Sequence, residues 1–111
     1  MKVEQQKIGT VDVFTPVGAL VDQDADAFSK QLLQRVKGSN PRVVVSMQEA
    51  PYVDSTALEG LLSATEELAN RAASLKLAAL CPTCREILEL TGLANRFRLF
   101  KDVQDAVKSF L

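Results

Sequence analysis

The side chains most capable of chemistry in this sequence of 111 residues are two hydroxyls and two thiols. Ser55 and Thr56 stand at the expected start of a helix, and Cys81 and Cys84 form a Cys-x-x-Cys motif ahead of another helix. A serine nucleophile needs a general base within hydrogen-bond reach, and a reactive dithiol needs one sulfur as thiolate. The sequence contains no histidine, which excludes Ser-His-Asp triads, Cys-His pairs and histidine metal sites.

The helix start at Ser55 suits an anion better than it suits catalysis. It follows a strand of the predicted sheet, at the end where open α/β folds place functional groups. Free backbone N–H groups and the helix dipole favour negative charge there, so a phosphate on Ser55 would find donors. From the residues alone a structural alternative is favoured, because Thr56 and Glu59 have the spacing of a capping box. With no base to activate Ser55, we expect no enzyme activity.

The Cys-x-x-Cys motif admits three interpretations. It could be a redox dithiol at a helix N-terminus, or half of a zinc site completed by a second chain. The third interpretation is packing, with Cys84 in the core and Cys81 near a helix cap. Packing is favoured because no tryptophan precedes the motif, and because Thr83 and Glu86 have the spacing of a second capping box. We therefore expect neither a metal nor a cofactor.

The strands and helices that would position these hydroxyls and thiols alternate along the chain. The hydrophobic patterns predict strands at 3–8, 11–17, 42–47, 75–80 and 98–100, and helices between 24 and 37, between 56 and 72, and at 82–90 and 103–111. This β-β-α-β-α-β-α-β-α order predicts one α/β domain over residues 1–111, with a mixed, mainly parallel sheet and about four helices. The β-branched run at 42–47 is expected to be the central strand, and residues 3–8 to pair antiparallel through a hairpin at Gly9.

The first two helices carry clear amphipathic patterns. Asp24 is the candidate N-cap of the first helix, which ends before Gly38. The second helix should bury one apolar stripe against the sheet. That stripe comprises Leu58, Leu61, Leu62, Thr65, Leu68, Ala69 and Ala72.

The charge balance excludes a further class of function. Thirteen basic and 14 acidic residues give a net charge of −1 and a pI near 5.4, without the basic excess typical of nucleic-acid binders. The polar start of the chain is unlike a signal peptide, and the longest apolar run, 77–81, is far shorter than a membrane span. We expect a cytoplasmic protein that does not insert into membranes.

Three segments resemble, in order, the STAS domain, which is the fold of bacterial anti-sigma factor antagonists. Residues 54–62 are similar to the family's phosphorylation motif, Asp-Ser-[Ser/Thr]-Gly-Leu-Gly ahead of a leucine-rich helix. Residues 18–20 with 24–25 resemble the segment that opens the first helix, Gly-x-Leu-Asp-x-x-Thr-Ala. Residues 82–93 resemble the Ser-Pro helix that closes on Ser/Thr-Gly-Leu, and the three matches together span most of the chain.

The resemblance implies a partner-switching protein. In this family the unmodified antagonist binds an anti-sigma factor that is also its serine kinase, and phosphorylation of the first serine after the aspartate abolishes binding. Ser55 matches that serine, with Thr56 the weaker candidate, and a PP2C-type phosphatase would reset the switch. The implied partner-binding residues are Asp22, Asp24, Asp54, Ser55, Thr56, Ala57 and Glu59.

The sequence departs from the family pattern at three positions. Ala57 and Glu59 replace two glycines, which predicts a bulkier and more acidic helix start facing the partner. Val21 stands where the family often has an aspartate, and Asp22 follows it. Two other functions are alternatives to the antagonist. The chain could be the STAS subunit of an ABC-type lipid transport complex, binding its ATPase, or it could be a dithiol oxidoreductase.

Overall fold

The computed structural model describes residues 1–111 as strands and helices in the predicted order. The strands are β1 (Lys2–Ile8), β2 (Val11–Val17), β3 (Val43–Ser46), β4 (Lys76–Ala78) and β5 (Arg98–Phe100). The helices are α1 (Asp22–Val36), α2 (Ser55–Ala69), α3 (Pro82–Leu90) and α4 (Val103–Lys108), with a short 3-10 helix at Ala94–Arg96. The predicted fold class is confirmed.

The five strands form one sheet in the order β1-β2-β3-β4-β5. β1 pairs antiparallel with β2, and the remaining pairs are parallel. Gly9, with φ +61°, provides the left-handed backbone that a two-residue hairpin turn requires at its first position. The central place predicted for residues 42–47 is confirmed by β3, which is buried along its whole length.

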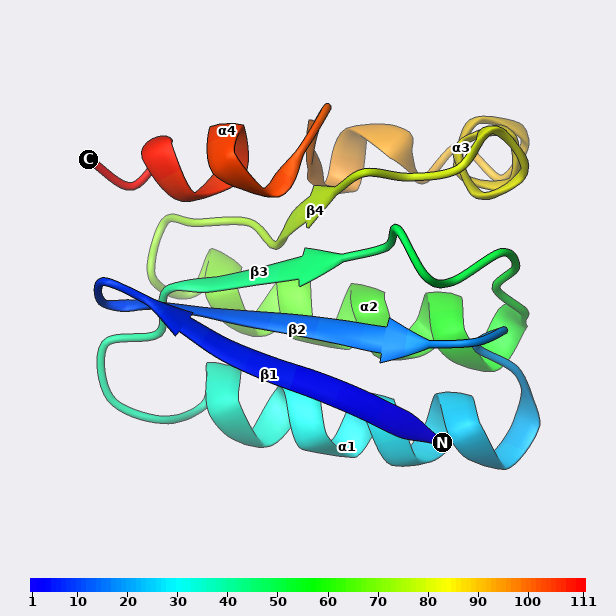
Figure 1. The fold of residues 1–111 in the computed structure, drawn as a ribbon, viewed down its shortest axis with the longest axis horizontal. Helices are drawn as coiled ribbons and strands as arrows, with labels where there is room; N and C mark the ends of the chain where they lie inside the picture. The colour runs from blue at the N-terminus through cyan, green and yellow to red at the C-terminus, as the bar shows by residue number, and fades with distance from the viewer.

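Helices cover the two faces of the sheet unequally (Figure 1). Phe14, Val45 and Leu77 face the larger core, which α1, α2 and α3 close from one side. Val44 and its neighbours on the opposite face pack against the short helix α4 through Ala106. α1 and α2 pack directly against each other, so their first turns lie side by side at the carboxyl end of the parallel strands.

The predicted start of the first helix was wrong. α1 begins at Asp22 and not after Asp24, its N-cap is Val21, and no side chain of α1 itself caps it. The backbone N–H of Asp22 is instead satisfied by a carboxylate from the start of α2, described below. A contact between distant segments has therefore replaced the local cap.

The predicted stripe of α2 was correct except at its carboxyl end. Leu61, Thr65 and Leu68 are buried as predicted, but Ala69 is exposed. Ala72 is also exposed and lies beyond the helix, where its φ of +57° belongs to the chain reversal that leads to β4.

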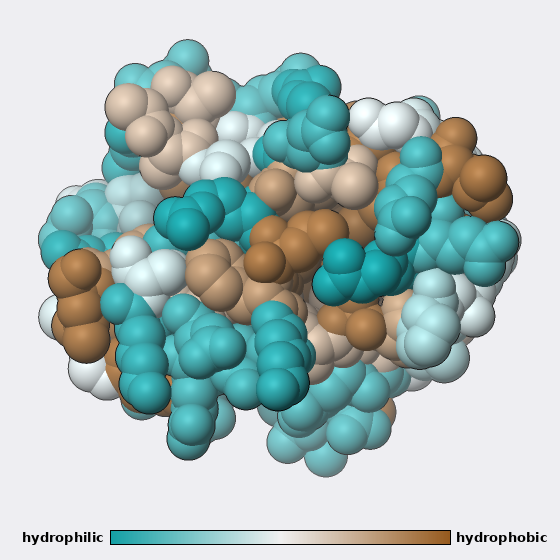
Figure 2. All heavy atoms as spheres, turned by 90° about the horizontal axis from the view of Figure 1, so that it is seen from above, coloured by the Kyte–Doolittle hydropathy of each residue, from teal (hydrophilic) through white to brown (hydrophobic).

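The face formed by α3 and α4 is mixed in character (Figure 2). Hydrophobic side chains lie across its centre with hydrophilic ones around them. Each helix of the structure is too short or too polar to cross a membrane.

Candidate functional site

Asp54 connects the first turns of α1 and α2. Its Oδ1 accepts a hydrogen bond from the backbone N–H of Ala57 at 2.9 Å, and its Oδ2 accepts one from the N–H of Asp22 at 2.8 Å. The N–H of Asp54 donates to the carbonyl oxygen of Leu20 at 3.1 Å. One side chain therefore caps α2 and fixes the start of α1 beside it.

The predicted capping box of Thr56 and Glu59 was wrong. Asp54 is the N-cap, and Ser55 and Thr56 are the first two residues of α2. Asp54 accepts from the third helical N–H, that of Ala57, whereas the box placed the N-cap two residues later, at Thr56. Neither hydroxyl takes part in a side-chain hydrogen bond of the protein, so the hydroxyls of Ser55 and Thr56 are both unused by the fold.

The residues after Asp54 differ in their access to a partner. Ser55 and Glu59 are exposed, one turn apart on the same side of α2, and Thr56 is half-buried. Ala57 is only 2 % exposed and belongs to the main core. The prediction that Ala57 faces a partner was therefore wrong, because Ala57 lies one turn before Leu61 on the buried stripe of α2.

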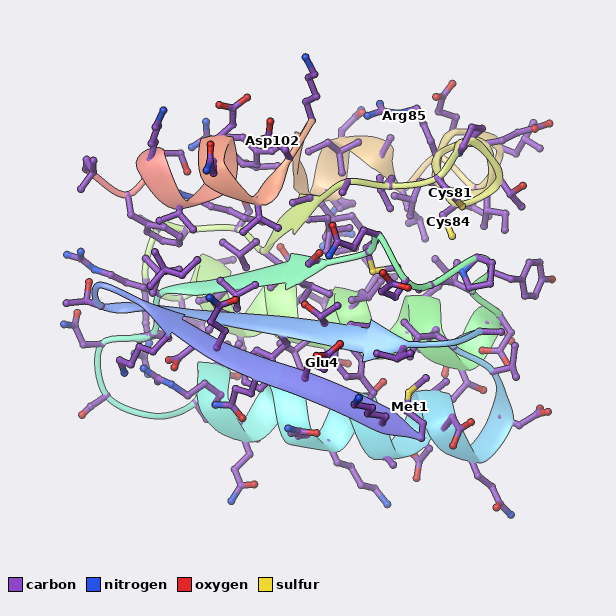
Figure 3. The ribbon with its side chains drawn as sticks, in the orientation of Figure 1. Met1, Glu4, Cys81, Cys84, Arg85 and Asp102 are labelled. Atoms are coloured by element: carbon purple, nitrogen blue, oxygen red, sulfur yellow. The ribbon has the colours of Figure 1, made fainter.

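The two aspartates of α1 lie in its first turn. Asp22 is exposed and adopts a φ of +51°, a left-handed conformation that its bond to Asp54 holds in place. Asp24 is half-buried, and its carboxylate lies 3.2 Å from the amino group of Met1, a residue labelled in Figure 3. With Asp54 and Glu59, these side chains make the surface around Ser55 acidic.

The carboxylate of Asp54 should make stability at this site depend on pH. The N–H of Asp22, and then that of Ala57, lowers the pKa of Asp54 below its ordinary 3.8. A lowered folded pKa contributes stability above the unfolded pKa and loses it as pH falls through the folded value. We therefore expect Asp54→Asn to lower the melting temperature at neutral pH, and to lower it less at about pH 3, below the ordinary pKa of 3.8, where the carboxylate of the unfolded chain takes up a proton.

Thermal unfolding of both proteins at the two pH values would measure this difference. Asp26→Asn is the matched control, since Asp26 is exposed and makes only a surface ion pair with Lys30 at 3.0 Å. An equal loss of melting temperature at both pH values would show that the charge of Asp54 has no part in the cap.

Cys81 and Cys84 lie at the start of α3 (Figure 3). The Sγ of Cys81 accepts a hydrogen bond from the N–H of Cys84 at 3.4 Å, so Cys81 is the N-cap of α3. The predicted box of Thr83 and Glu86 was wrong, because the N-cap is Cys81, and Thr83, two residues later, lies inside the first turn of α3. The packing interpretation is confirmed for Cys84, which is fully buried and donates its S–H to the carbonyl of Ala50 at 3.4 Å.

Only one of the two thiols should react in the folded protein. Burial, followed by the nearby sulfur of Cys81, raises the pKa of Cys84 to about 12, which leaves almost no thiolate near neutral pH. We expect iodoacetamide to add one group to the native chain, at Cys81, and two groups in denaturant, as read by intact mass. In Cys81→Ser the native protein should stay unmodified. Rapid addition of two groups to the native protein would reopen the dithiol oxidoreductase hypothesis.

The residue that sequence reasoning missed at this site is Gly60. A Cβ built on Gly60 would overlap with the Oγ and Cβ of Ser29 on α1, so the two helices approach closely at this point. The signal in the sequence was a glycine inside a leucine-rich helix. Glycine there lowers helix stability by about 1 kcal/mol relative to alanine, so its presence indicates that close packing excludes a larger side chain.

Comparison with known proteins agrees with this geometry. A Bordetella bronchiseptica protein, BtrV, whose name describes it as a candidate anti-sigma factor antagonist, is 24 % identical over 110 residues, which cover 99 % of this chain and 95 % of that protein. The anti-sigma factor antagonist SpoIIAA in its unphosphorylated form has a similar structure, with a TM-score of 0.82 at 15 % identity over 98 % of this chain and 96 % of that one. The Bacillus SpoIIAA in its phosphorylated form gives 0.76 at 14 % identity, covering 99 % and 100 %.

The same fold occurs in a transport protein. A sulfate transporter family protein from Wolinella succinogenes has a TM-score of 0.74 at 19 % identity, over 89 % of this chain and 83 % of that one. The family model described as the STAS domain matches residues 2–106. The sheet order and the contact between the first turns of α1 and α2 agree with this match. We conclude that the chain belongs to the STAS domain family.

Proposed function

We propose that this chain is an anti-sigma factor antagonist, and that phosphorylation of Ser55 switches off its binding to an anti-sigma factor kinase. The observation that carries the proposal is the state of Ser55, which is exposed, hydrogen-bonded to no side-chain partner, and placed directly after the capping Asp54. The names of BtrV and SpoIIAA support the antagonist function, and the phosphorylated form of SpoIIAA supports the modification. Such a protein would act in the cytoplasm, where sigma factors act.

A phosphate on Ser55 would add about −1.5 to −2 charges to a surface that is already acidic. Asp54 occupies the N–H groups of Ala57 and Asp22, so the phosphate cannot take these donors without breaking the cap. Glu59 lies one turn away on the same side of α2. The added charge would therefore stay exposed, and an anti-sigma factor would have to desolvate it on docking.

Ser55 is the better substrate of the two hydroxyls. A kinase must hold the acceptor hydroxyl in its own active site, and Ser55 is exposed whereas Thr56 is half-buried in the first turn. The surface proposed for the partner is formed by Asp22, Asp24, Asp54, Ser55, Thr56 and Glu59, with Ala57 supporting it from the core.

Mass spectrometry after incubation with the cognate kinase and ATP would test the proposal. We expect one phosphate, mapped to Ser55, no phosphate on Ser55→Ala, and removal by a PP2C-type phosphatase. Ser63→Ala is the matched control, because Ser63 is an exposed serine two turns further along α2. A chain that never gains phosphate at Ser55 would contradict the switch.

The transport alternative has one observation in its favour, the likeness to the sulfate transporter family protein. In that case the start of α2 would be a permanent interface with an ABC ATPase in a lipid transport complex, and Ser55 would be structural. Affinity purification from the native organism separates the two functions. Recovery of a GHKL-type kinase supports switching, and recovery of an ABC ATPase supports transport.

A further inference from the structure

A pocket lies at the end of the sheet opposite Ser55. It has a volume of about 330 Å³ and opens at the amino ends of β3, β4 and β5. Its apolar side includes Val43, Leu68 and Ala72, and its polar side includes Lys76 and Arg98. Pockets for small molecules have this composition, with mostly apolar walls and a few polar groups that fix orientation, and this volume is at the lower end of their range.

Lys76 is the unusual residue of this pocket. It is only 7 % exposed, and buried lysines are normally paired with a carboxylate. The Nζ of Lys76 donates to the Oγ of Ser109 at 2.6 Å and lies 3.4 Å from the centre of the Phe110 ring. None of the ion pairs in the protein includes Lys76, so its positive charge meets a hydroxyl and an aromatic face but no anion.

Two further cations surround Lys76. Arg98 is its register partner on β5, and Arg42 precedes β3 and donates to the Oγ1 of Thr10 at 3.2 Å. Neither arginine takes part in an ion pair. Desolvation, and then Arg98 and Arg42, lower the pKa of Lys76. The local charge is therefore uncompensated, and a bound anion would relieve both the desolvation and the repulsion.

We propose that this pocket binds a small organic anion with an apolar body, of the monocarboxylate class. The carboxylate would lie against Lys76 and Arg98, since guanidinium groups bind carboxylates with strong, directional hydrogen bonds. The apolar body would cover Val43, Leu68 and Ala72. An inorganic anion would use only the basic half of the pocket. This site is independent of Ser55 and of the proposed function.

Calorimetric titration of the full chain with octanoate and with benzoate tests the proposal, with the neutral octanamide and benzamide as matched ligands. We expect at least one carboxylate to bind and its amide to bind about tenfold more weakly or not at all, because a charge-assisted contact is lost. Arg98→Gln should weaken carboxylate binding to a similar extent. Arg85→Gln is the control, because Arg85 is an exposed arginine on α3 near the other end of the sheet (Figure 3).

A second measurement does not depend on a variant that folds. The pKa of Lys76, followed by NMR of its side chain, should rise when the carboxylate binds, since an anion stabilises the ammonium form. Absence of binding by both carboxylates, equal binding of acid and amide, or an unchanged affinity in Arg98→Gln would overturn the proposal. Inorganic phosphate that binds as tightly as the carboxylate would also overturn it, because the apolar wall would then have no part in recognition.

Discussion

Ser55→Asp is expected to bind the anti-sigma factor about tenfold to a hundredfold more weakly than Ser55→Ala, which should keep the affinity of the unmodified protein. The aspartate places a negative charge between Asp54 and Glu59, in the part of the surface that docking would dehydrate. One carboxylate carries less charge than a phosphate, so the modified protein should bind more weakly still.

Calorimetry with the purified anti-sigma factor would measure these affinities. Ser63→Asp is the matched control, because it adds the same charge to an exposed position of α2 two turns from the site. Equal affinities for Ser55→Asp and Ser55→Ala would show that Ser55 is not the control point. A loss in Ser63→Asp as large as that in Ser55→Asp would show that net charge, and not the position at the helix start, decides binding.

Gly60→Ala is expected to destabilise the protein by about 1 to 3 kcal/mol, the usual cost of forcing an extra group into a packed interface. In an exposed helix the same change would stabilise by up to about 1 kcal/mol. The sign reverses here because the new Cβ overlaps with Ser29, whose hydroxyl is bonded to the carbonyl of Ala25 on α1. The two helices would have to separate, and the contact between Asp54 and Asp22 depends on their spacing.

Denaturant unfolding would measure the stability change. Ser63→Ala, at an exposed position of the same helix, should change the free energy of unfolding by less than about 0.5 kcal/mol. The double variant Ser29→Gly/Gly60→Ala removes the overlapping side chain and should recover part of the loss. A Gly60→Ala protein as stable as the wild type would contradict a close helix approach.

Much of the fold was predictable because burial sets its local patterns. The β-branched run at 42–47 indicated a strand covered on both faces, and β3 is that strand. The helix starts were less predictable, because the cap of a helix depends on which side chain reaches its free N–H groups. Thr56 and Thr83 have the right local spacing, but the residues two positions earlier, Asp54 and Cys81, are the N-caps.

The candidate site was predictable in part for the same reason. The exposure of Ser55 follows from its position at a helix start, and this agrees with the structure. The burial of Ala57 follows from its position four residues before Leu61 on the buried stripe of α2, whereas no local pattern reports the contact of Asp54 with Asp22, 32 residues away. Lys76 and Arg98 lie opposite each other because of the register between β4 and β5, and no local sequence pattern reports that register.

The separation of charge along the sheet has a kinetic consequence. Asp22, Asp54 and Glu59 lie at one end, and Lys76 and Arg98 lie at the other, so the two proposed sites carry opposite charge. The field of a basic partner would turn such a molecule to approach with its acidic end first, before any contact forms. Association with that partner would then be fast at low ionic strength and slower in salt. A phosphate on Ser55 would change the orientation in which the protein approaches the partner as well as its affinity for it.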